Sequence, residues 1–201
     1  MEKHELEIML QELDDALVAA FPDAAPLQAL VVGGACLLLT EVTSRPTNDI
    51  DLIIFDLMGS SEENSLIYTT PLAAKIRRII MRIGKLHGLK GDQRMFLNDD
   101  CAPFLLEIGN NELPEMRLWG EYQKLRLYIP DDLSYILACK FMAGRPDKDF
   151  RDTVALCQLL GVQTRDQAQE VVDRFFPSKN HQSDYNLPAT LDIFFPEDEK
   201  G

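Results

Sequence analysis

The 201-residue sequence predicts an α+β fold, in which a small β-sheet with flanking helices is followed by a helical C-terminal part. Short apolar runs bounded by Gly, Pro and Asn predict strands, and from residue 130 onward the apolar spacing becomes helical. The predicted strands are 27–32, 49–55, 104–108, 117–119 and 124–129. These patterns divide the chain into a core at 1–129, a helical part at 130–177 and a polar tail at 178–201.

Three helices are predicted in the core, at 4–21, 35–41 and 71–86. The first has apolar residues at helical spacing with acids opposite, and Pro22 ends it. The second is apolar on all sides, so it should be buried. Pro71 is suited to the first position of the third helix, because its missing N–H is not needed there.

Three more helices are predicted in the C-terminal part, at 131–143, 148–160 and 164–176. Asp131 and Asp147 can cap the first two at their N-termini, and Gly144 and Gly161 can end them. Thr164 begins a capping-box pattern that opens the third. The polar tail that follows is expected to be loose or draped over the body of the protein.

The composition is that of a globular protein with a core, at 46% hydrophobic and 26% charged residues. No apolar run reaches the roughly 20 residues needed to span a bilayer, and the acidic N-terminal segment lacks a signal-peptide pattern. We therefore expect a cytoplasmic protein without a membrane partner. The cysteines have no C-x-x-C spacing, which is typical of reduced core thiols rather than of a zinc site or a disulfide framework. They are Cys36, Cys101, Cys139 and Cys157.

The net charge of −13 argues against nucleic-acid binding by the whole surface, but the charge is unevenly distributed. Residues 71–94 hold seven Lys and Arg side chains and a single acid, Asp92. A polyanion would therefore bind near this segment, although a solvated helix face also explains these charges.

Two carboxylates, Asp49 and Asp51, interrupt the second apolar run. Residues two apart in a strand project from the same face, so both carboxylates point one way while Ile50 points into the core. Such a pair is typical of a Mg²⁺ site, because Mg²⁺ is held by one or two carboxylates together with substrate phosphates. Mn²⁺ is an alternative ion. Solvated acids on an edge strand would also explain the pair, but the apolar neighbours favour a central strand.

Gly33 and Gly34 follow the first strand and open a helix. Backbone amides at a helix start without side chains can approach a phosphate closely. The P-loop and dinucleotide-binding patterns are both absent, and a tight turn alone would explain the glycines. Joined to the carboxylates of the next strand, they predict a site in which amides hold a triphosphate and carboxylates hold its Mg²⁺.

Lys140 lies within an apolar stripe of the predicted helix 131–143, where a lysine must bind an anion or extend to solvent. Arg145 supplies a second cation near the same helix end. Asp149 and Asp152 lie three residues apart on the next helix, so they can pair with these cations and orient them. Acids favoured by the helix dipole explain Asp149 as well.

These residues resemble the nucleotidyltransferase superfamily of the DNA polymerase beta type, over about residues 27–176. The first motif is Gly-Gly, a short helix and then Arg45-Pro-Thr47-Asn-Asp49-Ile-Asp51-Leu. The second resembles K-x(4)-R-x(2,3)-[RK]-D-x-x-D and comprises Lys140, Arg145, Lys148, Asp149 and Asp152. Within the superfamily, the chain looks like the compact bacterial branch related to AbiEii-type abortive-infection toxins.

The resemblance implies a mixed-sheet nucleotidyltransferase core and Mg²⁺-dependent transfer of a nucleotide from an NTP to a hydroxyl. The implied metal ligands are Asp49 and Asp51. The implied catalytic residues are the same two acids together with Lys140, Asp149 and Asp152. Implied nucleotide-binding residues are Gly33, Gly34, Arg45, Thr47 and Arg145. Many members have Gly-Ser where this chain has Gly33-Gly34, so a serine contact is missing.

A third carboxylate is common in the superfamily, and the candidate is Glu107 on the predicted strand 104–108, with Asp100 as the second choice. The expected acceptor is an RNA end, plausibly that of tRNA, bound through the basic segment 71–94, and a protein side chain is the second choice. A cognate antitoxin is an expected partner. The alternative function is a non-catalytic nucleotide-binding or toxin–antitoxin module that retains the fold.

Overall fold

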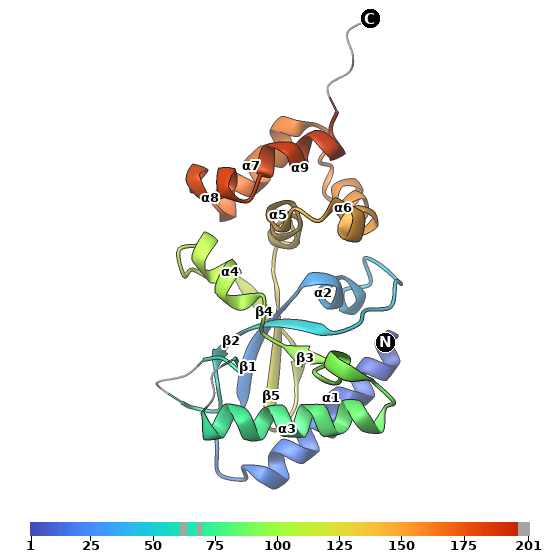
Figure 1. Cartoon of the computed structure of the whole chain (residues 1–201), viewed down its shortest axis with the longest axis vertical. Helices are drawn as coiled ribbons and strands as arrows, with labels where there is room; N and C mark the ends of the chain where they lie inside the picture. Colours follow the sequence, from blue (N-terminus) through green and yellow to red (C-terminus); the bar gives the residue numbers. More distant parts are fainter. Residues whose placement is uncertain (61–63, 68–69, 197–201) are drawn as a thin grey trace, which may run out of the picture. The chain divides into compact units, whose positions relative to one another are not determined.

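The structure is a computed structural model that describes residues 1–60, 64–67 and 70–196 (Figure 1). The chain forms two compact units, of which the first comprises Met1–Ala102 with Met116–Ile129 and the second comprises Pro103–Glu115 with Pro130–Gly201. The sheet belongs to the first unit, and the second is helical where it is described. The predicted α+β class is thereby confirmed.

The sheet in the described residues has five strands in the order β3-β2-β1-β5-β4. The strands are β1 (Leu27–Val32), β2 (Ile50–Asp56), β3 (Leu97–Asn98), β4 (Met116–Glu121) and β5 (Leu125–Pro130). β1 runs antiparallel to β2 and parallel to β5, and β2 runs parallel to β3, so the sheet is mixed. The register places Asp51 of β2 opposite Val32 on one side and Asn98 on the other. The end of β1, the start of β2 and the end of β3 therefore meet.

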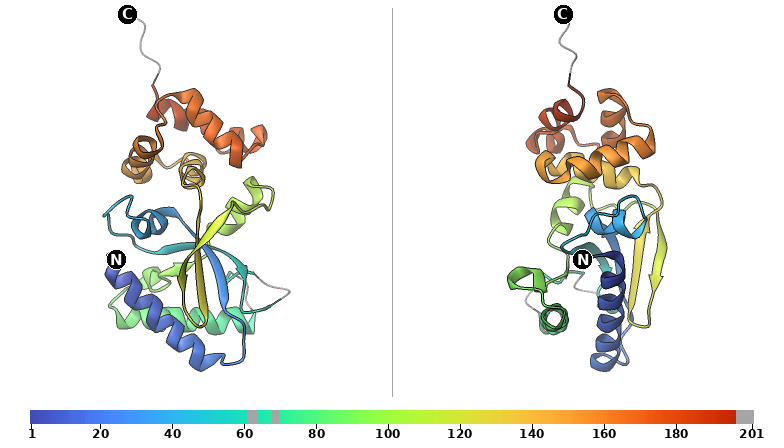
Figure 2. Two further views of the ribbon diagram at one scale, coloured as in Figure 1. Left: turned by 180° about the vertical axis from the view of Figure 1, so that it is seen from behind. Right: turned by 90° about the vertical axis from the view of Figure 1, so that its right-hand side faces the viewer.

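Two amphipathic helices, α1 (Lys3–Ala20) and α3 (Pro71–Leu86), pack against each other in the first unit (Figures 1 and 2). Each buries one apolar stripe, as the helical spacing predicts. The Thr70 side chain caps α3 by accepting a hydrogen bond from the Ala73 N–H, and Pro71 occupies the first turn as predicted. The turn after α3 leads through η1 (Gly91–Arg94), a short 3-10 helix, into β3.

The prediction of a strand at 104–108 is wrong, because this segment forms α4 (Ala102–Ile108). Leu105 and Ile108 are buried three residues apart, which is helical spacing. Pro103 in the first turn is compatible with a helix start. The Phe104 ring packs edge-on against Tyr185, with 4.7 Å between ring centroids, within the second unit.

The second unit is built around α5 (Ser134–Ala143), which contacts three neighbouring helices. These are α6 (Pro146–Leu160), α7 (Arg165–Phe175) and α9 (Leu187–Phe194). Gly144 and Gly161 end α5 and α6 in the left-handed conformation, as predicted, and the Thr164 capping box is confirmed. Asp131 and Asp147 are not caps, because Leu133 and Arg145 occupy these positions.

Residues 178–196 of the tail contain α8 (Lys179–Asp184) and α9, and α9 contacts α5, α6 and α7, so this part of the tail is draped over other helices rather than loose. Leu187 and Leu191 are fully buried, so α9 has a core-facing side despite the polar composition around it. Residues 197–201 lie outside the described part of the chain. Within the described residues, no helix is both long and apolar enough to cross a membrane.

Candidate functional site

The turn at Gly33 touches the Asp51 carboxylate. Gly33 begins α2 (Gly33–Leu39) directly after β1, with a φ of +63°. A Cβ atom at Gly33 would lie 2.7 Å from Oδ2 of Asp51, which is too close for any real side chain. A side chain at this position would therefore displace the carboxylate of β2. The glycine turn and the carboxylate that the sequence predicts to form one site are neighbours.

Three more predicted residues lie in the same part of the first unit. A Cβ atom at Gly34 would be 3.5 Å from Oγ1 of Thr47 and 3.8 Å from Nη2 of Arg45. The Thr47 hydroxyl donates a hydrogen bond to the Asp49 carbonyl at 2.9 Å, which shapes the entry into β2. Both carboxylates of the first motif are partly buried, Asp51 on β2 and Asp49 immediately before it. The first motif is thus assembled around the start of α2.

The end of β3 adds a residue that sequence reasoning missed. Asn98 is buried and lies in register beside Asp51, so its carboxamide is on the same face of the sheet as that carboxylate. The Asp100 N–H donates to Oδ1 of Asn98 at 3.2 Å, and Asp100 itself is exposed. A polar triplet directly after the apolar Phe96-Leu97 pair was the signal for this strand end.

Asp99, between these two residues, is fully buried and serves another purpose. Its Oδ2 accepts hydrogen bonds from the Ser65 hydroxyl at 2.6 Å and from the Leu66 N–H at 2.9 Å. Burial raises the pKa of Asp99 above its ordinary value, and the two hydrogen bonds oppose this rise. Asp99 therefore anchors residues 65–66 to the end of β3.

The donor set of the first unit suits a hard cation. Asp49 and Asp51 offer carboxylate oxygens, and Mg²⁺ completes its shell with water and substrate phosphate. Within residues 1–60, 64–67 and 70–196, no group of three or more His, Cys, Asp or Glu side chains is placed to hold a metal. Glu107, the predicted third ligand, lies exposed on α4 rather than on a strand, and it belongs to the second unit. Asp100, the second choice, is exposed and lies two residues after the end of β3, the strand beside β2.

The second motif is assembled within the second unit. Nζ of Lys140 on α5 donates to Oδ1 of Asp149 at 2.8 Å and to Oδ2 of Asp152 at 3.0 Å on α6. All three side chains are buried, and that of Lys140 is only 6% exposed. Nε of Arg145 lies 3.3 Å from the other Asp149 oxygen, and this side chain is 58% exposed. The predicted pairing of both acids with the cations is confirmed.

This geometry separates the roles of the two cations. Lys140 is enclosed between two carboxylates, which compensates the cost of burying its charge. Arg145 is held by Asp149 on one side and open to solvent on the other, so a ligand can reach it, as it can reach the exposed Lys148. Two cations and two carboxylates leave the cluster without net charge.

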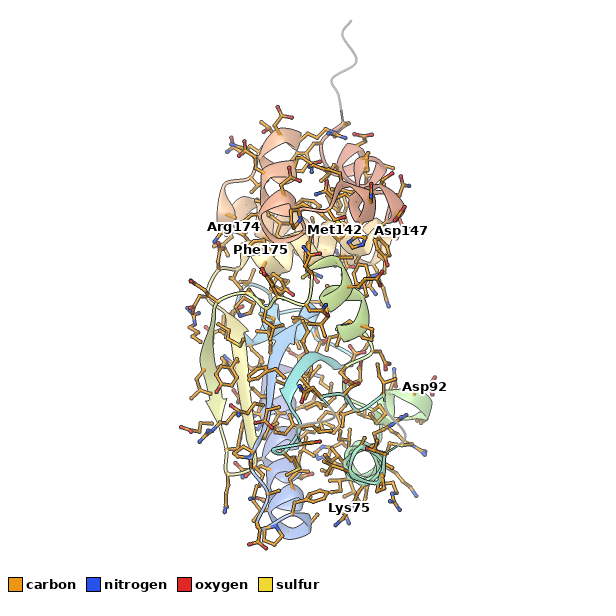
Figure 3. All side chains as sticks on the ribbon, turned by 90° about the vertical axis from the view of Figure 1, so that its left-hand side faces the viewer. Lys75, Asp92, Met142, Asp147, Arg174 and Phe175 are labelled. Atoms are coloured by element: carbon orange, nitrogen blue, oxygen red, sulfur yellow. The ribbon has the colours of Figure 1, made fainter. Side chains whose placement is uncertain are left out.

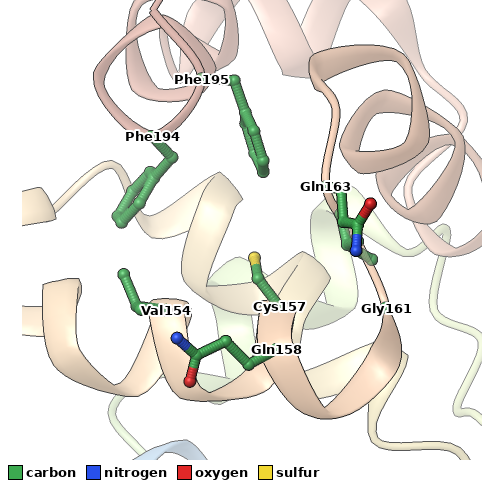
Figure 4. A pocket seen from close by; sticks show the side chains of 8 residues that line it. Val154, Cys157, Gln158, Gly161, Gln163, Phe194 and Phe195 are labelled. Carbon is green, nitrogen blue, oxygen red and sulfur yellow. The ribbon is translucent and has the colours of Figure 1, made fainter.

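A hollow of about 460 Å³ lies between the ends of α6 and α9, in the second unit (Figure 4). Phe194 and Phe195 face Cys157 across it, and Gln158 and Gln163 lie at its border. Burial raises the pKa of the Cys157 thiol to about 11, so this thiol is a poor nucleophile at neutral pH. None of the predicted site residues lines this hollow.

Comparisons with curated proteins and with solved structures gave no match. A protein-family model described as "Nucleotidyltransferase of unknown function (DUF6036)" matches residues 8–160. The matched range contains both motifs and ends with α6, so α7, α8 and α9 lie beyond it. Because the match spans most of the chain, the protein belongs to this family of nucleotidyltransferases of unknown function.

Proposed function

We propose that this protein is a Mg²⁺-dependent nucleotidyltransferase that moves a nucleotide from an NTP to a hydroxyl acceptor. The observation that carries the proposal is the contact between the Gly33 turn and the Asp51 carboxylate. A phosphate-binding turn next to a pair of metal-binding carboxylates is the arrangement that a metal–triphosphate complex requires. Family membership supports the general class.

The residues of the first unit have distinct tasks in this proposal. Amides at the start of α2 bind phosphate oxygens, and the exposed Arg45 guanidinium can add a forked contact. Asp49 and Asp51 would hold the metal, which would supply neutralisation of the phosphate charge. Attack of the acceptor oxygen on the α-phosphorus would form the new phosphoester bond and break the bond from the α-phosphorus to the oxygen bridging to the β-phosphorus. Pyrophosphate would leave with that oxygen, and the hydroxyl proton would pass to solvent. Rate enhancement comes mainly from positioning and charge neutralisation, as in phosphoryl transfer generally.

In the second unit, Arg145 is the proposed nucleotide contact, and Lys140, Asp149 and Asp152 act on it indirectly. The buried Lys140 fixes both carboxylates, and Asp149 in turn holds the Arg145 guanidinium. Such support reduces the side-chain freedom that Arg145 would lose on binding a phosphate. We therefore regard Lys140 as a positioning residue.

The proposed setting follows the resemblance to AbiEii-type toxins. An RNA end, such as that of tRNA, is the first choice of acceptor, and a protein side chain is the second. A cognate antitoxin is a candidate partner. The scattered cysteines, without a C-x-x-C pair, suit a reducing cytoplasm.

The test is transfer of label from α-labelled NTPs to total RNA in the presence of Mg²⁺. Asp49→Asn and Asp51→Asn each remove a metal-binding charge at nearly unchanged size, so labelling should fall at least ~100-fold, as for lost transition-state stabilisation of about 3 kcal/mol. Asp23→Asn, at an exposed position in the turn after α1, is the matched control and should label like the unchanged protein. Equal labelling by all four proteins would overturn the catalytic assignment.

A second function, nucleotide binding without turnover, is favoured by one observation. The described residues contain no three-acid metal cluster, which fits a site that holds an NTP without transferring it. Calorimetric titration with Mg²⁺ and NTP distinguishes the two functions. Binding that Asp51→Asn abolishes, without labelling of RNA or protein by the unchanged chain, would identify the non-catalytic module.

A further inference from the structure

The orientation of α3 defines an exposed basic surface. Ile76, Ile80 and Ile83 are buried, which fixes the opposite side of the helix toward solvent. Arg78, Arg82 and Lys85 lie on that side at positions i, i+4 and i+7, and all three are exposed. They span roughly 10 Å along the helix at 1.5 Å per residue. Lys90, also exposed, follows in the turn after α3. These four residues are called the basic stripe.

The other cations of this segment are engaged within the chain. Lys75 donates to the Ala20 carbonyl at 3.0 Å and lies over the Phe21 ring, at the end of α3 shown in Figure 3. Arg77 and Arg94 donate to backbone carbonyls as well. The guanidinium of Arg78 makes one hydrogen bond, through Nε, to the Ala74 carbonyl in its own helix.

The basic stripe differs from an ordinary solvated helix face. Such faces usually pair Glu or Asp with Lys or Arg three or four residues apart, but α3 contains no acid at all. Arg78 and Arg82 repel each other, since like charges at i and i+4 destabilise a helix by about 0.2–0.5 kcal/mol. Among the described residues, no ion pair is formed by Arg82, Lys85 or Lys90. A cationic stripe without counter-charges, in a chain of net charge −13, favours an external anion.

The chemistry of the basic stripe limits the class of anion that it can bind. A membrane-surface helix needs a continuous exposed apolar side, whereas the apolar stripe of α3 is in the core and only Met81 and Leu86 are exposed among its large apolar side chains. Arg guanidinium groups match phosphate oxygens with two parallel donors, and an extended row of cations matches a repeating phosphate chain. We infer that the basic stripe binds the phosphate backbone of a nucleic acid. Its role as an acceptor-binding surface rests on the proposed nucleotidyl transfer.

The salt dependence of binding has a defined expected size. Four phosphate contacts predict a slope of about −3 for log K against log salt concentration, at roughly 0.7 to 0.9 per contact. Between about 50 and 200 mM salt, the affinity should therefore fall by about 60-fold. The acidic remainder of the surface should keep the contact confined to this one stripe.

The experiment measures fluorescence anisotropy of three labelled probes, a single-stranded RNA, an RNA hairpin and a DNA duplex, over a salt series. The variant Arg82→Glu/Lys85→Glu reverses two stripe charges. The control Arg117→Glu/Arg151→Glu makes the same change in net charge at exposed positions on β4 and α6. The stripe variant should bind at least ~10-fold more weakly, with a slope reduced by about 1.5. The affinity of the control variant should stay within ~2-fold of that of the unchanged protein, as expected for charges without a phosphate contact.

Asp51→Asn separates this inference from the proposed function, because it should lose labelling but keep nucleic-acid binding. A chain that binds through the stripe yet labels nothing would contradict nucleotidyl transfer and leave the stripe assignment standing. Equal loss of binding in the stripe and control variants would overturn the stripe. The stripe assignment is also overturned if no probe binds at low salt. It is overturned too if polyglutamate displaces the RNA probe from the protein as effectively as unlabelled RNA does. Preference among the three probes identifies which nucleic acid supplies the backbone.

Discussion

At the scale of single residues, Gly33 sets the geometry of the proposed nucleotide site. Two conditions require glycine there: a positive φ and a Cβ position that Asp51 already fills. The sequence could predict that Gly33 and Asp51 are neighbours, because they are close along the chain and the strand spacing is regular. It could not predict Asn98, whose position beside Asp51 depends on pairing between β2 and β3, more than forty residues apart.

Gly33→Ala should therefore impair both stability and nucleotide binding. Left-handed backbone costs about 1–2 kcal/mol for a residue with a Cβ, and the clash would also displace the Asp51 carboxylate. Gly88→Ala is the matched control, because Gly88 has a φ of +77° but open space around its Cβ position. Urea unfolding should show a lower free energy of unfolding in both variants. Titration with Mg²⁺ and NTP should show weakened binding only for Gly33→Ala. Equal nucleotide affinity in the two variants would contradict this account of the site.

Asp99 gives a second prediction at this scale, in the pH dependence of stability. Burial raises its pKa in the folded chain, so the folded state holds the proton at pH values where the unfolded chain has released it. Its contribution to stability is thus greatest below the unfolded pKa, about 3.9 for Asp, and is lost as pH rises through the raised folded value.

Asp99→Asn removes this titration while keeping a polar side chain of similar size. The free energy of unfolding of the unchanged protein, relative to that of the variant, should fall as pH rises from about 4 toward neutrality, in keeping with this linkage. Urea unfolding followed by circular dichroism over that range measures the difference. A difference that grows with pH would show that the hydrogen bonds from Ser65 and Leu66 outweigh burial.

At the scale of elements, the errors of sequence reasoning fall on short segments. The run at 104–108 suits a strand or a helix equally by composition, and five residues are too few to establish a period. Its helical form depends on burying Leu105 and Ile108 together. The long amphipathic helices α1 and α3 were predicted almost to the residue, because their apolar stripes extend over several turns.

The contact between α5 and α6 depends on a buried ion cluster, and Lys140→Met tests it. Removing the ammonium leaves the buried Asp149 and Asp152 without their shared cation, which should cost about 3–5 kcal/mol of unfolding free energy. Lys148→Met, a change at an exposed position of α6, should alter the free energy of unfolding by no more than about 0.5 kcal/mol. Denaturant unfolding gives both values.

A triple variant with Lys140→Met, Asp149→Asn and Asp152→Asn distinguishes a charge effect from a packing effect. Because it removes the unpaired charges, it should recover much of the stability that Lys140→Met loses. No recovery would mean that the shape of the lysine stem, rather than its charge, holds α5 against α6. Arg145 remains in this variant without its carboxylate partner, so nucleotide affinity should stay weakened even where stability returns.

At the scale of the whole molecule, the chain combines two motifs that fold in separate units. The family match covers both motifs, whereas α7, α8 and α9 lie beyond it. Of these, α7 was predicted from its capping box, whereas α8 and α9 were hard to predict because they are short and their surroundings are polar. Their positions depend on nonlocal burial, as at Leu187 and Leu191, which no local pattern reveals.

Ligand linkage gives a prediction for the intact chain. A ligand that binds only the folded state stabilises it by about 2.7 kcal/mol at a hundredfold excess over its Kd. For a chain of this length, about 2–4 °C in Tm per kcal/mol would give a rise of roughly 5–10 °C with Mg²⁺ and NTP together. NTP with a chelator should give a smaller rise, because the carboxylates then face the phosphates without a cation. Asp51→Asn should lose the metal-dependent part of the rise and keep the part that depends on the α2 amides. A shift that is the same with and without Mg²⁺ would mean that the carboxylate pair does not take part in binding, and neither transfer nor metal-dependent sensing could then be assigned to it.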